Sequence, residues 1–477
     1  MSEELQDRVT PLRAVVPVIA AGVLLALSAL TPVLIAGRPG WLALMVVAPI
    51  VALMIFVNPT VGILGLFSLG MLGDLQHFEH FPSLSVLLVP CVLLGFAARS
   101  LAVKRRLRDQ LVLPLVLFVV TYCVGLCRGR HNLEGLSGAL VFAGYAAGFF
   151  LVINLIRTKR EIRMVFLSVG VGAALVSFAL ITQWLGMDTP LFLLSRPDLP
   201  LSGYEASKGV ERTLGFANDP NAAAYPCILA APILLALAAT VQKAWVRLPI
   251  FALFVATVVG LMTTQSRSGY LGLAVSLTVF LVLSGLRSHF RVIPVLIVLG
   301  SAAITYLPVG DFTSRLGGLR GDFDSDRGIQ YRLGFELFTQ NPVFGAGDEA
   351  FAMAMMREGL PPLQPHSNLL GVLTNSGLVG FLPFLAFFLG YARWLFHHWG
   401  KSRDRTLRIY AAGGLAAVAG LHTQGLFIGN MGWFLLWAMT GIPICCLLAR
   451  GNSETESKTA PSSAKRRANW RFELSAS

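Results

Sequence analysis

The chain has 477 residues, of which 55% are hydrophobic and only 13% are charged, and its formal net charge is +13. Soluble globular proteins carry about 25% charged residues, so this composition excludes a soluble enzyme and indicates an integral membrane protein. The apolar runs are continuous, which also argues against a β-barrel, because barrel strands alternate apolar and polar residues.

The sequence contains about fourteen apolar runs, most of them near the length that a helix needs to cross a bilayer. The first follows a basic N-terminus without a small-residue cleavage site, which favours a retained span over a signal peptide. The predicted fold class is therefore an all-α integral membrane protein. In chain order, the spans are expected at 14–36, 40–57, 59–73, 82–99, 111–127, 137–156, 164–186, 220–241, 247–265, 268–286, 292–309, 367–391, 407–428 and 431–449.

The charges of the loops predict the orientation. With an even number of spans, Lys and Arg concentrate on the side that holds both termini, as in 99–108, 157–160, 393–408 and the tail from 450. Cytoplasmic loops carry such an excess, so both termini are predicted inside. The net positive charge follows from this orientation and is not evidence for nucleic-acid binding.

The spans and loops divide the chain into four predicted parts. No nucleotide-binding glycine motif is present, and the six cysteines lie within apolar runs without metal-ligand spacing, so neither a cofactor nor a metal is expected. The parts are a transmembrane scaffold at 1–186, a core at 187–391 with outward loops 187–219 and 310–365, C-terminal helices at 392–449, and a disordered inner tail at 450–477.

The second outward loop is expected to contain one short amphipathic helix at 328–340. Leu333 and Leu337 fall on one face at helical spacing, and Asn341-Pro342 ends the pattern. The turn Gly345-Ala346-Gly347 follows, and the loop then leads into the next span.

Four outward positions are candidates for chemistry: Arg212, the turn residue Arg267, Arg327 with Arg332, and His366 with Asn368. Each has a simpler interpretation, because boundary arginines often reach lipid headgroups and a histidine at a helix start is often a surface residue. Together, however, several guanidinium groups suit a pyrophosphate. A nearby histidine could then accept a proton or stabilise a leaving phosphate.

At these positions the chain resembles the O-antigen ligase and O-antigen polymerase family of bacterial multi-span glycosyltransferases. The resemblance rests on the order of the motifs along the chain. The sequence departs from the family pattern at two positions, with Tyr331 where the family often has Trp and Ser367 where Asn is commoner. The motifs are Arg-x-x-Gly with Asp-Pro-Asn (Arg212, Gly215, Asp219, Pro220, Asn221), Ser-Arg-x-Gly (266–269), Arg-x-x-x-aromatic leading into Asn-Pro-x-x-Gly-x-Gly (Arg327, Tyr331, Asn341, Pro342, Gly345, Gly347), and a His motif followed by glycines (His366, Asn368, Leu369, Leu370, Gly377, Gly380).

The resemblance implies metal-independent, inverting transfer of a glycan from undecaprenyl pyrophosphate to an acceptor sugar hydroxyl, at the periplasmic face of the bacterial inner membrane. It implies that Arg267 and Arg327 bind the pyrophosphate. His366 would position or activate the acceptor or assist the leaving group, and Arg212 and Arg332 would be secondary contacts. The remaining expected substrate-binding residues are Asn221, Asn368 and Tyr331.

Three alternatives stay open at this point. The acceptor is either lipid A–core, as for a ligase, or a lipid-linked glycan, as for a polymerase. A transporter or flippase of an anionic solute or lipid would instead place its site near mid-membrane on broken helices in related halves. A structural scaffold would leave the four arginine positions unexplained.

Overall fold

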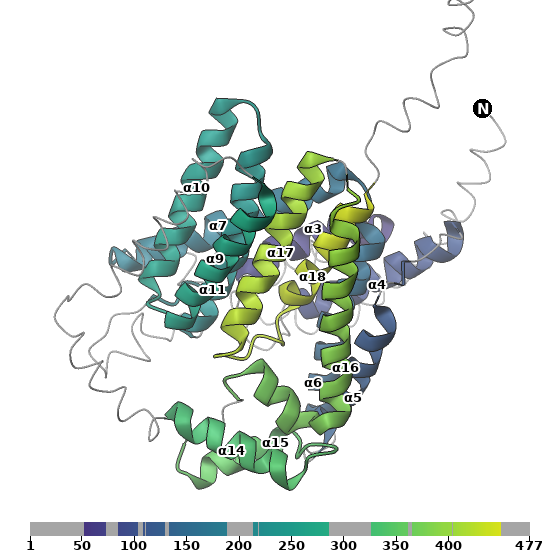
Figure 1. The fold of residues 1–477 in the computed structure, drawn as a ribbon, viewed down its shortest axis with the longest axis vertical. Helices are drawn as coiled ribbons and strands as arrows, with labels where there is room; N and C mark the ends of the chain where they lie inside the picture. Colours follow the sequence, from purple (N-terminus) through teal and green to yellow (C-terminus); the bar gives the residue numbers. More distant parts are fainter. Residues whose placement is uncertain are drawn as a thin grey trace, which may run out of the picture.

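The computed structural model describes residues 52–72, 84–103, 108–109, 111–128, 133–187, 213–217, 219–285, 326–360, 365–402 and 404–449. These residues form helices and connecting turns, and the described part contains no strand (Figure 1). The helices are α3 (Pro59–Leu69), α4 (Leu84–Val103), α5 (Val112–Cys127), α6 (Leu133–Leu155), α7 (Lys159–Trp184), α9 (Pro220–Thr240), α10 (Ala244–Thr263), α11 (Arg267–Ser284), α14 (Asp326–Gln340), α15 (Asp348–Arg357), α16 (Asn368–Trp399), α17 (Arg405–Gly425) and α18 (Phe434–Leu448).

The expectation of an all-helical membrane protein is confirmed. Six described helices are long and apolar enough to cross a membrane, namely α6, α7, α9, α10, α11 and α16, and four shorter helices are also apolar. The expected spans at 14–36 and 292–309, most of 40–57, and the tail at 450–477 lie outside the described residues. The count of fourteen spans and the inside position of both termini therefore stay predictions.

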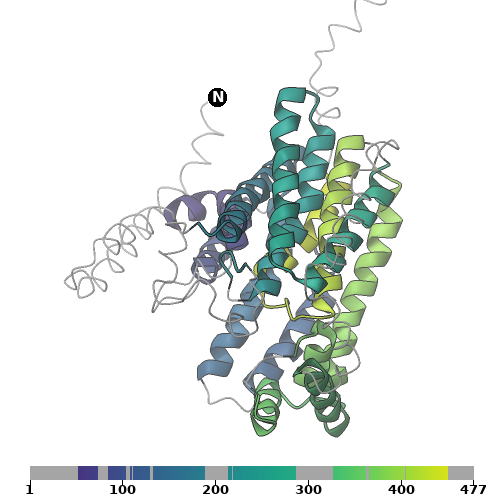
Figure 2. The ribbon, with the colours of Figure 1, turned by 90° about the vertical axis from the view of Figure 1, so that its left-hand side faces the viewer.

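The bundle is organised around α9, which packs against α7, α10, α11 and α17. Of the most apolar window of α9, 89% is buried inside the protein. A helix that is apolar on all sides is stable only when neighbours cover it completely, and α9 fits this rule. The helices α5, α6, α16 and α18 pack together beside this group, and contacts between α17 and α18 join the two sets (Figures 1 and 2).

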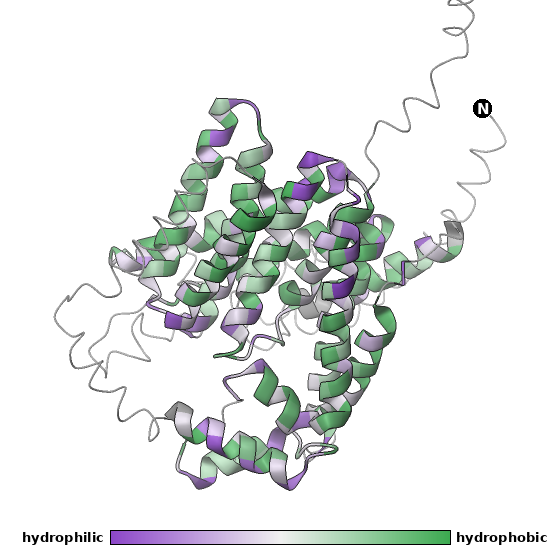
Figure 3. Cartoon of the chain, viewed as in Figure 1, coloured by the Kyte–Doolittle hydropathy of each residue, from purple (hydrophilic) through white to green (hydrophobic). Residues whose placement is uncertain are grey.

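Segments that the sequence assigns to one side of the membrane meet at one end of the bundle. At the basic end, Lys159 Nζ lies 2.8 Å from Asp404 Oδ2 and so ties the start of α7 to the start of α17. At the opposite end, the Thr213 N–H donates to Thr263 O at 3.2 Å. There the Gln183 side-chain oxygen also accepts from the Leu214 N–H at 2.8 Å. Hydrophilic residues gather at the ends of the bundle and on α14 and α15 (Figure 3).

The ion pair at the basic end gives a prediction for stability against pH. Burial acts to raise the pKa of Asp404, but the hydrogen bonds from Lys159 and from the Leu407 and Thr406 N–H groups, with the charge of Lys159, hold it below the ordinary value. A carboxyl group with a lowered pKa stabilises the fold above its unfolded pKa of about 4, and this stabilisation is lost as the pH falls. Asp404→Asn keeps a helix-capping side chain and removes the charge.

We therefore expect Asp404→Asn to melt at a lower temperature than the wild type near pH 7, with a difference that disappears below about pH 3. Thermal melting of both proteins in detergent across this pH range measures it. A difference that stays constant with pH would show that the charge of Asp404 contributes nothing.

Two helices lie across the end opposite the basic one, and only the first was expected from the sequence (Figures 1 and 2). The helix predicted at 328–340 is confirmed as α14, which begins two residues earlier and ends before Asn341-Pro342 as expected. The helix α15 lies in a stretch that was interpreted as loop. A small separate core joins the two helices through Leu333, Phe351 and Met355, which are at most 7% exposed.

The helix α16 is broken at Gly377, where φ is +59°. The break frees backbone groups, and the loop 341–347 satisfies them, as non-helical backbone at membrane depth requires. The Arg128 side chain at the end of α5 fixes this loop by donating to Gly345 O at 2.8 Å. The bonds across the break run from Ala346 N–H to Thr374 O (2.7 Å), from Leu378 N–H to Pro342 O (2.9 Å) and from Val379 N–H to Val343 O (3.0 Å).

Candidate functional site

His366 stands at the entrance to α16 and is held there through its backbone. Its N–H donates to Gln330 Oε1 at 3.3 Å. The Tyr331 hydroxyl lies 3.4 Å from His366 O and 3.3 Å from Leu426 O, within reach of donating to either carbonyl. Ser367 caps α16 by accepting from the Leu370 N–H at 3.5 Å. The position of His366 therefore depends on α14.

Asn368 joins this segment to the loop between α17 and α18. Its Nδ2 donates to Asn430 Oδ1 at 2.6 Å, and its Oδ1 accepts from the Asn430 N–H at 2.9 Å. Both side chains are buried, at 6% and 3% exposure. A reciprocal pair of hydrogen bonds between buried amides fixes the geometry of both residues. Asn368 thus lines the site and also holds the loop between α17 and α18 in position.

The loop between α17 and α18 is rigid because its backbone carbonyls are bound from several helices. The Tyr225 hydroxyl of α9 donates to Gly429 O at 2.9 Å, and the Trp437 indole donates to Met431 O at 2.9 Å. The Trp433 indole donates to Gly70 O at 3.0 Å, which ties the loop to the end of α3. Sequence patterns did not single out this loop.

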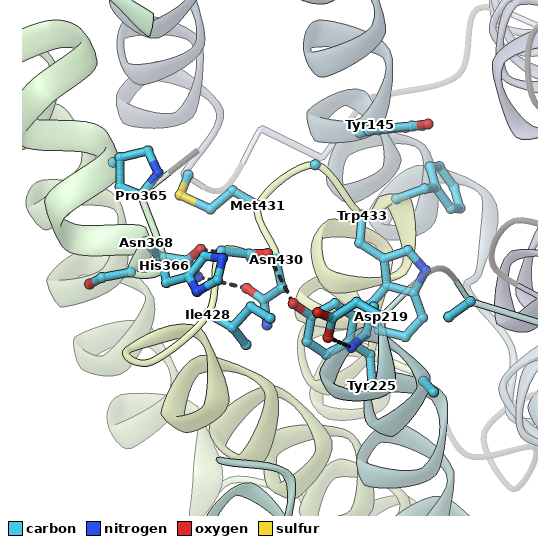
Figure 4. A pocket seen from close by; sticks show the side chains of 18 of the residues that line it. Tyr145, Asp219, Tyr225, Pro365, His366, Asn368, Ile428, Asn430, Met431 and Trp433 are labelled. Carbon is cyan, nitrogen blue, oxygen red and sulfur yellow. Dashed lines mark hydrogen bonds between the residues drawn. The ribbon is translucent and has the colours of Figure 1, made fainter. Parts of the chain in front are cut away.

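These elements enclose a cavity of about 520 Å³. His366 and Asn368 lie on one side of it, and Asp219, Tyr225 and Trp433 lie on the other (Figure 4). The lining is mostly apolar and aromatic with a few polar groups, which is the usual character of a pocket for an organic ligand. Among the described residues, the charged or titratable ones that line it are Tyr122, Tyr145, Asp219, Tyr225, Asp348 and His366.

Arg267 begins α11 with an exposed side chain, outside the set of residues that line the cavity. The turn before it is firmly held. The Ser266 hydroxyl donates to Asn221 Oδ1 at 2.8 Å and accepts from the Gly269 N–H at 3.1 Å. The structure thus presents the guanidinium group of Arg267 at the end of the bundle that carries the cavity, on a rigid support.

Asn221, expected to bind substrate, is buried in contacts between helices. Its side chain accepts from Ser266, and its carbonyl oxygen accepts from Gln424 Nε2 at 2.8 Å. Asp219 caps the start of α9 by accepting from the Asn221 N–H at 2.6 Å. The Asp-Pro-Asn motif therefore joins α9 to α11 and α17, and it is Asp219 that reaches the cavity.

The structure describes the other predicted arginines only in part or places them away from the cavity. Arg212 lies outside the described residues, and Arg327 is placed only as part of the first turn of α14, since its side chain is outside them. Arg332 forms an ion pair with Glu358 at 3.2 Å and does not line the cavity. Of the eight predicted site residues, the structure brings His366 and Asn368 into the cavity and sets Tyr331 behind them.

The pair of Arg332 and Glu358 gives a second prediction. Their side chains are 55% and 39% exposed, and exposed ion pairs contribute about 0–1 kcal/mol. We expect Arg332→Ala and Glu358→Gln each to lower the melting temperature in detergent slightly, and the double variant to lose no more than the larger single effect. Fully additive losses in this double-mutant cycle would show that the two side chains do not interact.

The lining residues that the sequence did not predict include Tyr122, Asp348 and Asn375, and also Asp219, which was noted only as part of a motif. One signal was present. After Gly347, the spacing of Phe351 and Met355 is that of one helical face. It would have predicted α15 and placed Asp348 in its first turn, where acidic residues are favourable.

Residues 251–385 match the sequence model of the Wzy_C family, described as O-antigen ligase. Over these residues the chain is similar to O-antigen ligases. The match runs from α10 into the second part of α16, so it includes the Arg267 turn, α14, α15, His366 and the break at Gly377. Arg212 and Asn221 lie before it. A search of curated proteins finds no match to the chain.

The match supports a function of the O-antigen ligase or polymerase type, and it implies a lipid-linked glycan as substrate. The resemblance that the motifs indicated is thereby confirmed for the segment that carries most of them.

Proposed function

We propose that this protein transfers a glycan from undecaprenyl pyrophosphate to the hydroxyl of an acceptor sugar. The observation that carries the proposal is the position of His366, which belongs to the segment that matches the O-antigen ligase model and lies in the cavity, with its backbone fixed and its side chain turned to the cavity. A histidine that is held rigidly beside a ligand pocket suits proton transfer.

In the proposed reaction, the acceptor oxygen attacks the anomeric carbon from the face opposite the pyrophosphate. The acceptor O–H proton passes to the imidazole of His366, the new glycosidic C–O bond forms, and the bond to the leaving oxygen breaks with its electron pair. Undecaprenyl pyrophosphate leaves, and the anomeric configuration is inverted. The imidazolium then returns its proton to the leaving pyrophosphate or to water.

Arg267 and Arg327 are proposed to hold the pyrophosphate. Guanidinium groups match phosphate oxygens in pairs and stay charged at any physiological pH. Arg267 is exposed on a rigid turn at the relevant end of the bundle, and Arg327 is in the first turn of the helix that holds His366. Arg212 and Arg332 are proposed as secondary contacts, Arg332 after release from Glu358.

The proposed active face is periplasmic, in the bacterial inner membrane. Its support is the charge pattern, because the end of the bundle with Lys159 and Arg405 is the basic one, and the cavity lies at the other. Cysteine labelling of a position near the cavity and of one near Lys159, with a reagent that does not cross membranes, tests the assignment. Labelling from the periplasm only at the position near Lys159 would reverse it.

The test of function uses the purified protein and an undecaprenyl-pyrophosphate glycan, offered either lipid A–core or only further donor as acceptor. Product on lipid A–core identifies a ligase, and longer lipid-linked chains identify a polymerase. Arg267→Ala, Arg327→Ala and His366→Ala are compared in preparations that insert and purify normally. Near-normal transfer by all three variants would contradict the proposed site.

A flippase or transporter is the second candidate, and the break in α16 is the observation that favours it, since transporters bind ligands at discontinuous helices. The break here is, however, filled by the loop 341–347, and no second described helix has a non-helical interior to pair with it. Movement of the lipid-linked glycan across proteoliposomes, without any new glycan product, would favour this candidate.

A further inference from the structure

Asn375, in the last turn of α16 before its break, has an amide group that is only half satisfied by the protein. The residue is 3% exposed and lines the cavity. Its Nδ2 donates to the carbonyl oxygen of Tyr122 at 3.0 Å. Because a carbonyl oxygen can only accept a hydrogen bond, the amide nitrogen of Asn375 faces it, and Oδ1 faces the other way. Buried within the described structure, Oδ1 has no hydrogen-bond partner there.

A buried acceptor without a donor costs free energy, so such groups are rare unless they have a function. Two further polar groups line the same cavity from other helices. Tyr122 of α5 packs its ring against Phe142 with centroids 4.5 Å apart, and its hydroxyl makes no hydrogen bond to a described residue. Asp348 in the first turn of α15 is 8% exposed.

The chemistry of these three groups selects a class of ligand. A carboxylate and an amide oxygen only accept hydrogen bonds, while a phenol both donates and accepts. A ligand rich in hydroxyl groups can form hydrogen bonds with groups of all three kinds. A phosphate offers no donor and carries the same charge as Asp348, so it is a poor match. The aromatic rings nearby provide apolar surface for the C–H face of a sugar.

The place of Asn375 along α16 separates it from the reacting end of the cavity. Asn368, Gly371 and Asn375 follow one another at i, i+3 and i+7 and all line the cavity, so they share one face of the helix. Seven residues span about 10 Å along a helix axis. Groups at Asn375 therefore contact a different part of an extended ligand from those at His366.

We propose that Asn375, Tyr122 and Asp348 form a subsite for a sugar ring of the glycan, remote from the hydroxyl or anomeric carbon that reacts beside His366. The inference rests on the proposed glycan transfer and adds where the carbohydrate is recognised. In this arrangement the arginines hold the pyrophosphate outside the cavity, and the side chain of Asn375, just before the break in α16, supplies an acceptor for the sugar.

The test measures binding of two separate probes to the purified protein by calorimetry. The first probe is the oligosaccharide repeat unit of the cell's own surface polysaccharide, released without lipid or phosphate. The second is inorganic pyrophosphate. Tyr122→Phe removes only a hydroxyl and keeps the ring packing, so we expect it to weaken oligosaccharide binding by about three- to tenfold. We expect Asn375→Ala to have at least this effect, and both variants to bind pyrophosphate like the wild type.

Tyr391→Phe is the matched control. Tyr391 lies on α16 beyond the break, its buried hydroxyl also lacks a hydrogen-bond partner among the described residues, and it does not line the cavity. We expect this variant to bind both probes like the wild type. The subsite is overturned if the wild type does not bind the oligosaccharide, or if Tyr122→Phe and Asn375→Ala both bind it as the wild type does.

Transfer assays on the same preparations separate this inference from the function. If the wild type transfers glycan but its oligosaccharide binding is unchanged by Tyr122→Phe and Asn375→Ala, the subsite is overturned and the proposed transferase function stands. Binding that depends on both residues, in a protein that transfers no glycan to any acceptor, supports the subsite and contradicts the transferase.

Discussion

His366→Ala is expected to lower the rate of glycan transfer by about 10²- to 10⁴-fold, the usual contribution of a positioned general acid or base. The fold should survive the change, because the protein holds this residue by its backbone. Its N–H is bound to Gln330, and its carbonyl oxygen lies beside the Tyr331 hydroxyl. The loss should therefore appear in kcat, in protein that elutes and melts like the wild type.

His397→Ala is the matched control for this prediction. His397 lies on the same helix at its opposite end, where its ring contacts Lys401. We expect its transfer rate to stay within about twofold of the wild type, as for surface substitutions in general. Initial rates with saturating donor and acceptor measure both variants. A His366→Ala enzyme that keeps a third or more of the wild-type kcat would rule out proton transfer by this side chain.

The membrane helices could be predicted closely from the sequence because their signal is local. An apolar run of sufficient length predicts a span without knowledge of its neighbours. The helices α7 and α9 accordingly agree with the expected spans at 164–186 and 220–241 to within about five residues. The helix α14 was predicted for the same reason, since Leu333 and Leu337 mark its buried face.

The cavity could not be predicted in this way, because distant segments form it. Asp348 was read as part of a loop, and Asn375 and Tyr122 as ordinary span residues, since an apolar run does not show which of its polar members share a pocket. The arginine motifs drew attention to charge. The described lining instead combines two carboxylates with aromatic rings, while Arg267 and Arg332 are exposed outside it.

The break in α16 shows the same limit. Gly377 was noted as one glycine at a glycine-rich start of a span, and the motif around Gly345 as a tight turn. The roles of the two segments depend on each other, because the loop 341–347 lies beside the break and forms hydrogen bonds with the backbone groups there. Neither segment has a pattern that predicts the other.

Gly377→Ala is accordingly expected to destabilise the protein strongly, by about 2–4 kcal/mol. Its φ of +59° is unfavourable for any residue with a β-carbon. An added β-carbon would also lie 2.5 Å from Val343 O and against the Gly345 nitrogen, and both contacts are with backbone that cannot move aside without losing the bonds across the break. The melting temperature in detergent and the yield of inserted protein measure the effect.

Gly138→Ala is the control, because a β-carbon at this position of α6 would meet no atom within 4 Å and the helix there is regular. We expect it to melt at or slightly above the wild-type temperature, since Ala favours helix over Gly by about 1 kcal/mol. Gly345→Ala should resemble Gly377→Ala, because its φ is +69° and its β-carbon would lie 2.6 Å from the Gly377 nitrogen.

The two glycines face each other, so their effects should not add. Once either substitution has pushed the loop 341–347 away from the break, the second has less contact left to disturb. The double variant is therefore expected to lose clearly less stability than the sum of the single losses. It should also bind the oligosaccharide more weakly than Gly138→Ala does, because Asn375 lies directly before the break. Additive losses, or a Gly377→Ala protein as stable as Gly138→Ala, would show that the loop does not support α16 at this point.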